Sequence, residues 1–213
     1  MPISAVLFDL DNTIYPASSG VMKGIDVRIT EYVQNLLGLE IEQAQELRRH
    51  YYRTYGTTLN GLQRHHGVDA EHYLSHVHDL AIESFLTSDA ELDHLLSELT
   101  ATKAIFTNSP AEYARRVLRA MGIERHFEHV FDIRFSGFRP KPDPVVYQSV
   151  LDALGVAGAN AMLVEDSPQN LPPARALGMT TILVGEPSDS DAAQADYMTP
   201  DVLAAVRIVL RLV

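Results

Sequence analysis

Short apolar runs recur along the chain, and most of them end at polar or acidic residues. A run of four or five apolar residues suits a strand that is buried on both faces. Helical patterns separate most of the runs, and strands that alternate with helices predict a parallel sheet with right-handed crossovers. We therefore expect an α/β fold, with a Rossmann-like parallel sheet flanked by helices. The five expected strands are Ser4–Phe8, Lys103–Thr107, His129–Ile133, Ala161–Val164 and Thr180–Val184.

Capping residues and prolines mark the helices between these strands. Ser109 followed by Pro110 predicts an N-cap and a proline at the first helical position, and Asp143 precedes a proline in the same way. Asp132 is expected to be a structural acid rather than a catalytic one. Residues 186–199 are acidic and poor in apolar side chains, so we expect a surface loop there. The helices expected around the sheet cover residues 89–99, 109–122, 143–155 and 202–212.

Two adjacent prolines, Pro172 and Pro173, restrict the start of one further helix. Proline is costly inside a helix but is tolerated in the first turn, where the backbone N–H groups have no partner within the helix. The helix is therefore expected to begin after Asn170. This start would leave Asp166 on a loop, where it is able to act as a ligand.

A long segment separates the first two expected strands, and a single crossover does not need that length. Apolar residues in this segment recur at spacings of three and four, without a strand signal, which predicts a small bundle of about four helices. We expect two domains. The α/β core comprises residues 1–16 and 88–213, and the inserted helical domain comprises residues 17–87.

Composition and charge exclude several classes of protein. The 17 basic and 28 acidic residues give a net charge of −11, which disfavours nucleic acid and anionic membranes as partners. The absence of cysteine excludes disulfides, thiol nucleophiles and zinc ribbons. The N-terminus lacks the basic segment of a signal peptide, and no apolar stretch reaches the roughly 18 residues of a membrane span. We expect a soluble, cytoplasmic protein, monomeric because no apolar heptad stripe suggests a partner.

Polar and acidic residues gather directly after the expected strands. In an open parallel sheet, ligands bind beyond the C-terminal ends of the strands. Carboxylates that meet at one edge of a sheet cannot all be ionised without a cation, and oxygen ligands without cysteine favour Mg²⁺ over zinc. A metal and a lysine together would form a cationic pocket in an acidic protein. The residues at this edge are Asp9 and Asp11, Thr107 and Asn108, Lys141, and Glu165 and Asp166.

The segment DLDNT, which begins at Asp9, resembles the D-x-D-x-T loop of the haloacid dehalogenase-like (HAD) hydrolase superfamily, and specifically of its phosphatase branch. The helical insertion resembles the movable cap of that superfamily. The segments FDLDNTIYPASSG and YYRTYGTTLNGL look most like those of pyrimidine 5'-nucleotidases. The remaining family motifs have counterparts in the same order, Thr107-Asn108 for the hydroxyl motif, Lys141 for the lysine and Glu165-Asp166 for the acidic motif.

The resemblance implies catalytic roles for three of these residues. Asp9 would attack the phosphorus of a phosphomonoester and form an aspartyl-phosphate, which water then hydrolyses. Asp11 would protonate the leaving group and later take a proton from water. Lys141 would bind the phosphoryl group and stabilise the charge that develops on it.

The resemblance also implies a binding site for phosphate and for Mg²⁺. The hydroxyl of Thr107 and the backbone N–H of Asn108 would bind phosphoryl oxygens. Asp9, Asp166 and the backbone carbonyl of Asp11 would bind the metal. The sequence leaves open whether Glu165 binds the metal directly or through water.

We therefore expect a Mg²⁺-dependent phosphomonoesterase that acts on a small metabolite, foremost a pyrimidine nucleoside 5'-monophosphate such as UMP or CMP. A sugar-phosphate phosphatase, a phosphoglycolate phosphatase or a phosphoglucomutase is the alternative, because the cap sets specificity. Two other classes are less favoured. Asp11 argues against a haloacid dehalogenase, and the large helical insertion argues against a receiver-type signalling module.

Overall fold

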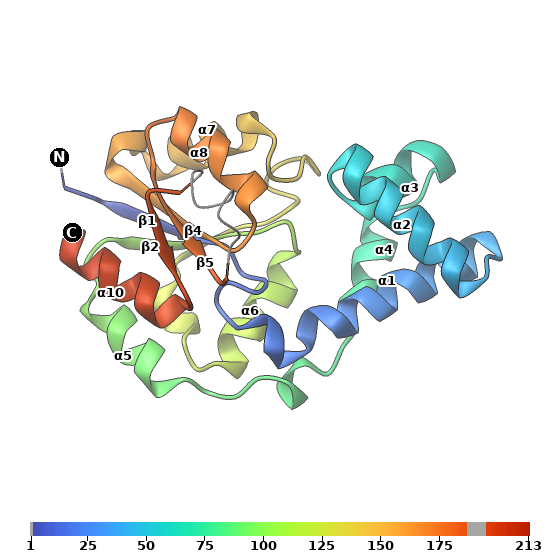
Figure 1. Ribbon diagram of the computed structural model, residues 1–213, viewed down its shortest axis with the longest axis horizontal. Helices are drawn as coiled ribbons and strands as arrows, with labels where there is room; N and C mark the ends of the chain where they lie inside the picture. Colours follow the sequence, from blue (N-terminus) through green and yellow to red (C-terminus); the bar gives the residue numbers. More distant parts are fainter. Residues whose placement is uncertain (1, 187–194) are drawn as a thin grey trace. The chain divides into compact units, whose positions relative to one another are not determined.

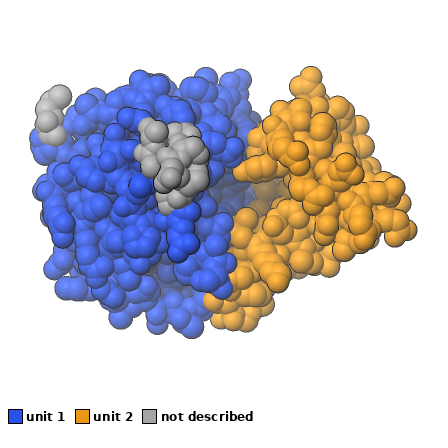
Figure 2. Space-filling view, viewed as in Figure 1, with its two compact units in different colours: residues 1–18, 86–213 blue, residues 19–85 orange. Residues whose placement is uncertain are grey.

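The computed structural model describes residues 2–186 and 195–213. The chain divides into two compact units, residues 1–18 with 86–213 and residues 19–85 (Figure 2). The first unit contains a parallel sheet, and the second consists of helices and their connections (Figure 1). Nowhere in the described residues is a helix both long and apolar enough to cross a membrane.

The sheet has six strands within the described part of the chain, in the order β3-β2-β1-β4-β5-β6, and every pair is parallel. All five expected strands are present, with ends shifted by at most two residues, and the predicted α/β class is confirmed. The strands are β1 (Ala5–Phe8), β2 (Thr102–Phe106), β3 (His129–Phe131), β4 (Ala161–Glu165), β5 (Thr180–Val184) and β6 (Tyr197–Thr199).

Strand β6 corrects one prediction. The sequence predicts a surface loop over residues 186–199, but Tyr197–Thr199 pairs with β5, with Tyr197 opposite Ile182. The strand is short and lies at the edge of the sheet, and the side chains of Tyr197 and Met198 are exposed. It therefore lacks the continuous apolar run that identifies a buried strand. Residues 187–194 of the predicted loop lie outside the described residues.

Helices cover both faces of the sheet. In Figure 1, α7 (Pro144–Leu154) and α8 (Leu171–Ala176) lie on one side, and α5 (Ala90–Glu98) and α10 (Val202–Leu212) lie on the other. On the first side, Leu7 of β1 belongs to a cluster of buried apolar side chains contributed by the strands and by α7 and α8. Because successive side chains of a strand point to opposite faces, each central strand is buried on both sides.

The predicted N-cap of α6 (Ala111–Ala120) is wrong. The helix begins one residue later than the capping pattern predicts, and Pro110 is its cap residue. The side chain of Asp132, which follows β3, accepts a hydrogen bond from the backbone N of Ala111 at 3.0 Å. Asp132 therefore has the structural role that the sequence suggests. Ser109 does not cap the helix, because its hydroxyl binds a carboxylate described below.

Two other predicted helix starts are confirmed. Asp143 caps α7 by accepting a hydrogen bond from the backbone N of Val145 at 3.0 Å. Helix α8 begins at Leu171, so both prolines lie in its first turn, and Asn170 is its cap residue without a capping hydrogen bond from the side chain. Asp166 lies just beyond the end of β4, outside regular secondary structure.

Four α-helices form the core of the second unit, as the periodicity predicts. Helices α2 and α3 approach each other closely at Gly61, where a Cβ atom would lie 2.2 Å from Cγ of Tyr51. The hydroxyl of Tyr51 forms a hydrogen bond with Nε2 of His66, at 2.8 Å. A side chain at position 61 would displace this tyrosine. The helices are α1 (Val21–Leu37), α2 (Ile41–Tyr55), α3 (Thr58–His66) and α4 (Ala70–Val77).

Candidate active site

The register of the three central strands determines which side chains meet at the edge of the sheet. Phe8, the last residue of β1, lies opposite both Ile105 of β2 and Val164 of β4. Residues that follow these positions therefore emerge side by side at the C-terminal edge. This geometry brings together Asp9, Thr107, Glu165 and Asp166, which the sequence predicts to meet.

Asp9 is buried, with 6% of its surface exposed, and both of its carboxylate oxygens have partners. Lys141 donates from Nζ to Oδ1 at 2.7 Å, and the hydroxyl of Thr13 donates to Oδ2 at 3.1 Å. Asn12, at φ 62°, adopts the left-handed conformation that asparagine tolerates, within the tight loop that joins Asp9 to Thr13. Burial raises the pKa of Asp9 to about 7, and the negative charge of Glu165 adds to this effect.

Lys141 lies between two carboxylates. Its Nζ is 2.7 Å from Oδ1 of Asp9 and 2.7 Å from Oε2 of Glu165, and the residue is only 3% exposed. Burial alone would lower the pKa of Lys141, but the two carboxylates outweigh this effect and raise it above its ordinary value. The ammonium group therefore carries its charge at physiological pH. It also lies 5.0 Å from the centre of the Phe106 ring.

Asn108 and Thr107 follow β2 and have different partners. The backbone N of Lys141 donates to Oδ1 of Asn108 at 2.7 Å, and Nδ2 of Asn108 donates to the carbonyl of Lys141 at 3.2 Å. The sequence predicts a role only for the backbone N–H of Asn108 and gives no signal for this role of its side chain. Oγ1 of Thr107 accepts a hydrogen bond from the backbone N of Ser109 at 3.0 Å, so the proton of the Thr107 hydroxyl remains available for donation.

Three carboxylates form a cluster beside the lysine. Within residues 2–186 and 195–213, oxygens of Asp9, Glu165 and Asp166 lie within 4.8 Å of one another. Burial raises the pKa of Asp166 to about 9, and the charges of Asp9 and Glu165 add to this rise. One ammonium group faces three carboxylates, so a divalent cation with a preference for oxygen ligands would balance the remaining charge. The cluster fits Mg²⁺, and it includes Glu165 but not the side chain of Asp11.

Three hydroxyl groups hold the side chain of Asp11. Tyr15 and Tyr113 donate to Oδ1 at 2.5 and 2.8 Å, and Ser109 donates to Oδ2 at 2.6 Å. The two tyrosines are 0% and 1% exposed. Burial, followed by the charge of Asp11, raises the pKa of both phenols above the usual range, so both remain protonated. The sequence predicts a helix cap at Ser109 and no role for Tyr113, because neither residue has a local signal that points to Asp11.

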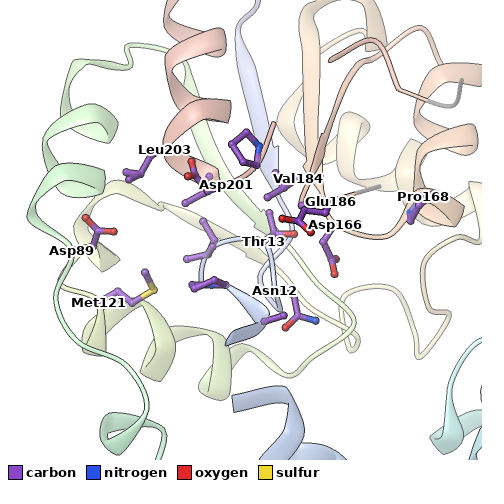
Figure 3. Close-up of a pocket in the computed structure, with 16 residues that line it drawn as sticks. Asn12, Thr13, Asp89, Met121, Asp166, Pro168, Val184, Glu186, Asp201 and Leu203 are labelled. Atoms are coloured by element: carbon purple, nitrogen blue, oxygen red, sulfur yellow. The ribbon is translucent and has the colours of Figure 1, made fainter. Parts of the chain in front are cut away.

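A cavity of about 510 Å³ opens beside the loop that follows β1. Asn12, Thr13 and Asp166 line it near this loop, and Met121 and Leu203 line it further away (Figure 3). Within the described part of the chain, the carboxylate that the sequence predicts as the nucleophile does not line this cavity. The cavity therefore adjoins the cluster of carboxylates and does not enclose the reacting atom.

Known proteins match this chain in sequence and in fold. The family model described as haloacid dehalogenase-like hydrolase matches residues 3–178, so the chain belongs to this family. A curated relative, Phosphate metabolism protein 8 of Saccharomyces cerevisiae, is 27% identical over 191 residues, which cover 83% of this chain. The chain spans only 60% of the length of that relative.

Solved structures share the fold at lower identity. A HAD phosphatase from Thermococcus onnurineus superposes with a TM-score of 0.66 at 21% identity, covering 97% of this chain and 98% of its own. An L-2-haloacid dehalogenase from Xanthobacter autotrophicus superposes with a TM-score of 0.62 at 17% identity, covering 99% and 100%. Because proteins of two different activities superpose similarly well, the fold alone does not choose between these reactions.

Proposed function

We propose that the protein is a Mg²⁺-dependent phosphomonoesterase that forms an aspartyl-phosphate at Asp9. The observation that carries the proposal is the environment of this residue. A buried carboxylate contacts the ammonium group of Lys141, and a second acid, Asp11, follows two residues later. The ammonium group attracts a phosphate dianion, and the second acid supplies the proton that an alkoxide leaving group requires.

The reaction has two steps. In the first, an oxygen of Asp9 bonds to phosphorus, the ester P–O bond breaks, and Asp11 gives its proton to the leaving oxygen. In the second, Asp11 takes a proton from water as the water oxygen bonds to phosphorus, and the bond between phosphorus and Asp9 breaks. Free phosphate leaves, and both acids return to their starting state.

The remaining residues bind the phosphoryl group and the metal. Thr107 donates its hydroxyl proton to a phosphoryl oxygen, and Lys141 balances the negative charge during transfer. Asp9 and Asp166 would hold the Mg²⁺ ion, together with the backbone carbonyl of Asp11 that the family resemblance implies, and Glu165 belongs to the same cluster of carboxylates. When bound, the ion supplies positive charge that reduces the repulsion between a carboxylate and a phosphate dianion.

We further propose that residues 17–87 act as a cap that selects the substrate, with residues 1–16 and 88–213 as the catalytic core. The preferred substrate is a pyrimidine nucleoside 5'-monophosphate, on the resemblance of the segments that begin at Phe8 and Tyr51. A sugar phosphate or phosphoglycolate is the alternative. The proposal also includes a monomeric state and a cytoplasmic location.

Haloacid dehalogenation is the competing reaction for this fold. It also uses an aspartate that forms an ester, but its halide leaving group needs no proton. The family resemblance implies that dehalogenases of this fold lack an acid two residues after the nucleophile. Asp11, held by three hydroxyl groups, therefore favours phosphate ester hydrolysis.

A substrate panel tests the proposal. Phosphate release is measured from UMP, CMP, AMP, phosphoglycolate and glucose 1-phosphate, with Mg²⁺ or with EDTA, and chloride release is measured from 2-chloropropionate. We expect Mg²⁺-dependent phosphate release, fastest from UMP and CMP. Faster phosphate release from another ester would identify a different substrate and would leave the proposed reaction unchanged. Chloride release without phosphate release would overturn the proposal.

A further inference from the structure

Asp11 has an unusual set of partners for an acid at the edge of a sheet. Its hydrogen bonds come from three neutral hydroxyl groups, on Tyr15, Ser109 and Tyr113. The three donors come from separate places in the chain. Tyr15 follows the loop after β1, Ser109 follows β2, and Tyr113 lies in the first turn of α6. The oxygens of the two phenols are also 3.0 Å apart.

We propose that Tyr15, Tyr113 and Ser109 are positioning residues that hold the carboxyl group of Asp11 where it can transfer a proton to the leaving oxygen. The inference rests on the proposed function, because it assigns a purpose to the acid of that reaction. The D-x-D-x-T motif, which covers Asp9 to Thr13, does not include the two tyrosines.

The geometry indicates that the hydroxyl groups position Asp11, and that they do more than find hydrogen-bond partners for themselves in the protein interior. Each phenol has one proton, and when both protons point at Oδ1 of Asp11, none remains for the contact between the phenols. The two oxygens are thus held close together by a shared acceptor. Ser109 binds the other oxygen of the carboxyl group, so donors fix both ends and limit its rotation.

Neutral donors also suit an acid that must change its charge. A hydroxyl group can donate to a carboxylate or accept from a carboxylic acid, so the three hydroxyls hold Asp11 in either state. By contrast, the ammonium group of Lys141 contacts Asp9, which acts as a nucleophile and must remain ionised. The two acids of the loop therefore have partners that match their different proposed tasks.

A comparison of two leaving groups tests this inference. Single-turnover phosphoryl transfer is measured with p-nitrophenyl phosphate, whose leaving group needs no proton, and with UMP, whose alkoxide does. We expect Tyr113→Phe and Tyr15→Phe to slow transfer from UMP at least about tenfold, and transfer from p-nitrophenyl phosphate by less than about threefold. Ser109→Ala should have the same selective effect, and it provides a smaller change if a tyrosine variant fails to fold.

Tyr147→Phe is the matched control. Tyr147 is also a fully buried tyrosine, and its hydroxyl donates to the backbone carbonyl of Asn170 at 2.8 Å, not to Asp11. The control should leave the ratio of the two rates unchanged. The inference would be overturned if Tyr15→Phe, Tyr113→Phe and Ser109→Ala slowed transfer from both esters equally. It would also be overturned if these variants did not slow transfer from UMP. If the wild type acts on neither ester, the proposed function itself fails, and the inference fails with it.

Discussion

The side-chain amide of Asn108 is joined to the backbone of Lys141 by two hydrogen bonds, of 2.7 and 3.2 Å. Lys141 lies on the connection between β3 and α7, not at the end of a strand. Its backbone therefore lacks the ladder of hydrogen bonds that fixes Asp9. The amide of Asn108 replaces this ladder, and it places the ammonium group 2.7 Å from both of its carboxylate partners.

Asn108→Ala removes both hydrogen bonds, and we expect it to lower kcat by about ten- to a hundredfold through misplacement of Lys141. The free energy of unfolding should fall by about 1–3 kcal/mol, because the backbone groups lose their partner. Steady-state kinetics and urea denaturation measure the two effects. Asn160→Ala is the control, since its amide binds the backbone carbonyl of Pro2 away from the site. An unchanged kcat in Asn108→Ala would refute the role of the amide.

Lys141→Met should abolish measurable phosphatase activity and destabilise the fold. The substitution removes the ammonium group that pairs with the buried carboxylates of Asp9 and Glu165. Breaking a buried ion pair by removing one partner costs about 3–5 kcal/mol, because the remaining charge has no partner. Urea denaturation in EDTA measures the decrease in the free energy of unfolding. Wild-type stability in this variant would mean that the buried ion pairs do not form.

The raised pKa values of Asp9 and Asp166 predict an unusual dependence of stability on pH without metal. Both are raised from 3.8, to about 7 and about 9, so the folded protein retains protons that the unfolded chain has lost. Their contribution to stability is complete below about pH 4 and is lost as pH rises through about 7 and then about 9. Denaturation in EDTA between pH 6 and pH 9 should therefore show Asp166→Asn gaining stability relative to the wild type as pH rises.

Mg²⁺ should reverse this loss. A cation bound by the ionised carboxylates stabilises only the folded state, by about 2.7 kcal/mol at a concentration one hundred times its Kd. The rise in melting temperature should be larger at pH 8 than at pH 6, because protons compete with the metal. Asp166→Asn should show little of this rise. Equal stabilisation of both proteins by Mg²⁺ would argue against Asp166 as a ligand.

Much of the fold follows directly from the sequence. Apolar runs such as Ala161–Val164 identify strands because a parallel strand is buried on both faces. The meeting of Asp9 with Glu165 and Asp166 also follows, since parallel strands end at one edge. Tyr197–Thr199 does not follow, because an edge strand has no continuous apolar pattern.

The residues that position the site are harder to predict from the sequence than the residues that they hold in place. Tyr113 is 102 positions from Asp11, and its place in the amphipathic pattern of α6 indicates only a core position. The side chain of Asn108 binds backbone atoms, which carry no residue-specific signal. Ser109 has the sequence of a helix cap, but the folded chain satisfies that helix start with Asp132 and leaves the serine hydroxyl for Asp11.

The close contact of α2 with α3 provides a stability test within the helical unit. Gly61→Ala would force the ring of Tyr51 to move, and we expect a loss of about 1–3 kcal/mol. Gly24→Ala is the matched control, because the three atoms nearest to its new methyl group all belong to the flexible side chain of Leu80. Thermal denaturation compares the two variants. A smaller loss in Gly61→Ala than in Gly24→Ala would contradict the tight packing.

The central claim is that Asp9 becomes phosphorylated during turnover. The most direct measurement is a rapid acid quench. The protein is mixed with Mg²⁺ and a phosphomonoester that it hydrolyses, and the reaction is stopped in acid within milliseconds. Peptide mass spectrometry then locates the phosphoryl group. We predict a phosphoryl group on Asp9 in the wild type, and neither this group nor phosphate release in Asp9→Asn. Phosphate release by Asp9→Asn at the wild-type rate, with no phosphorylated aspartate detected, would contradict the claim that Asp9 is phosphorylated.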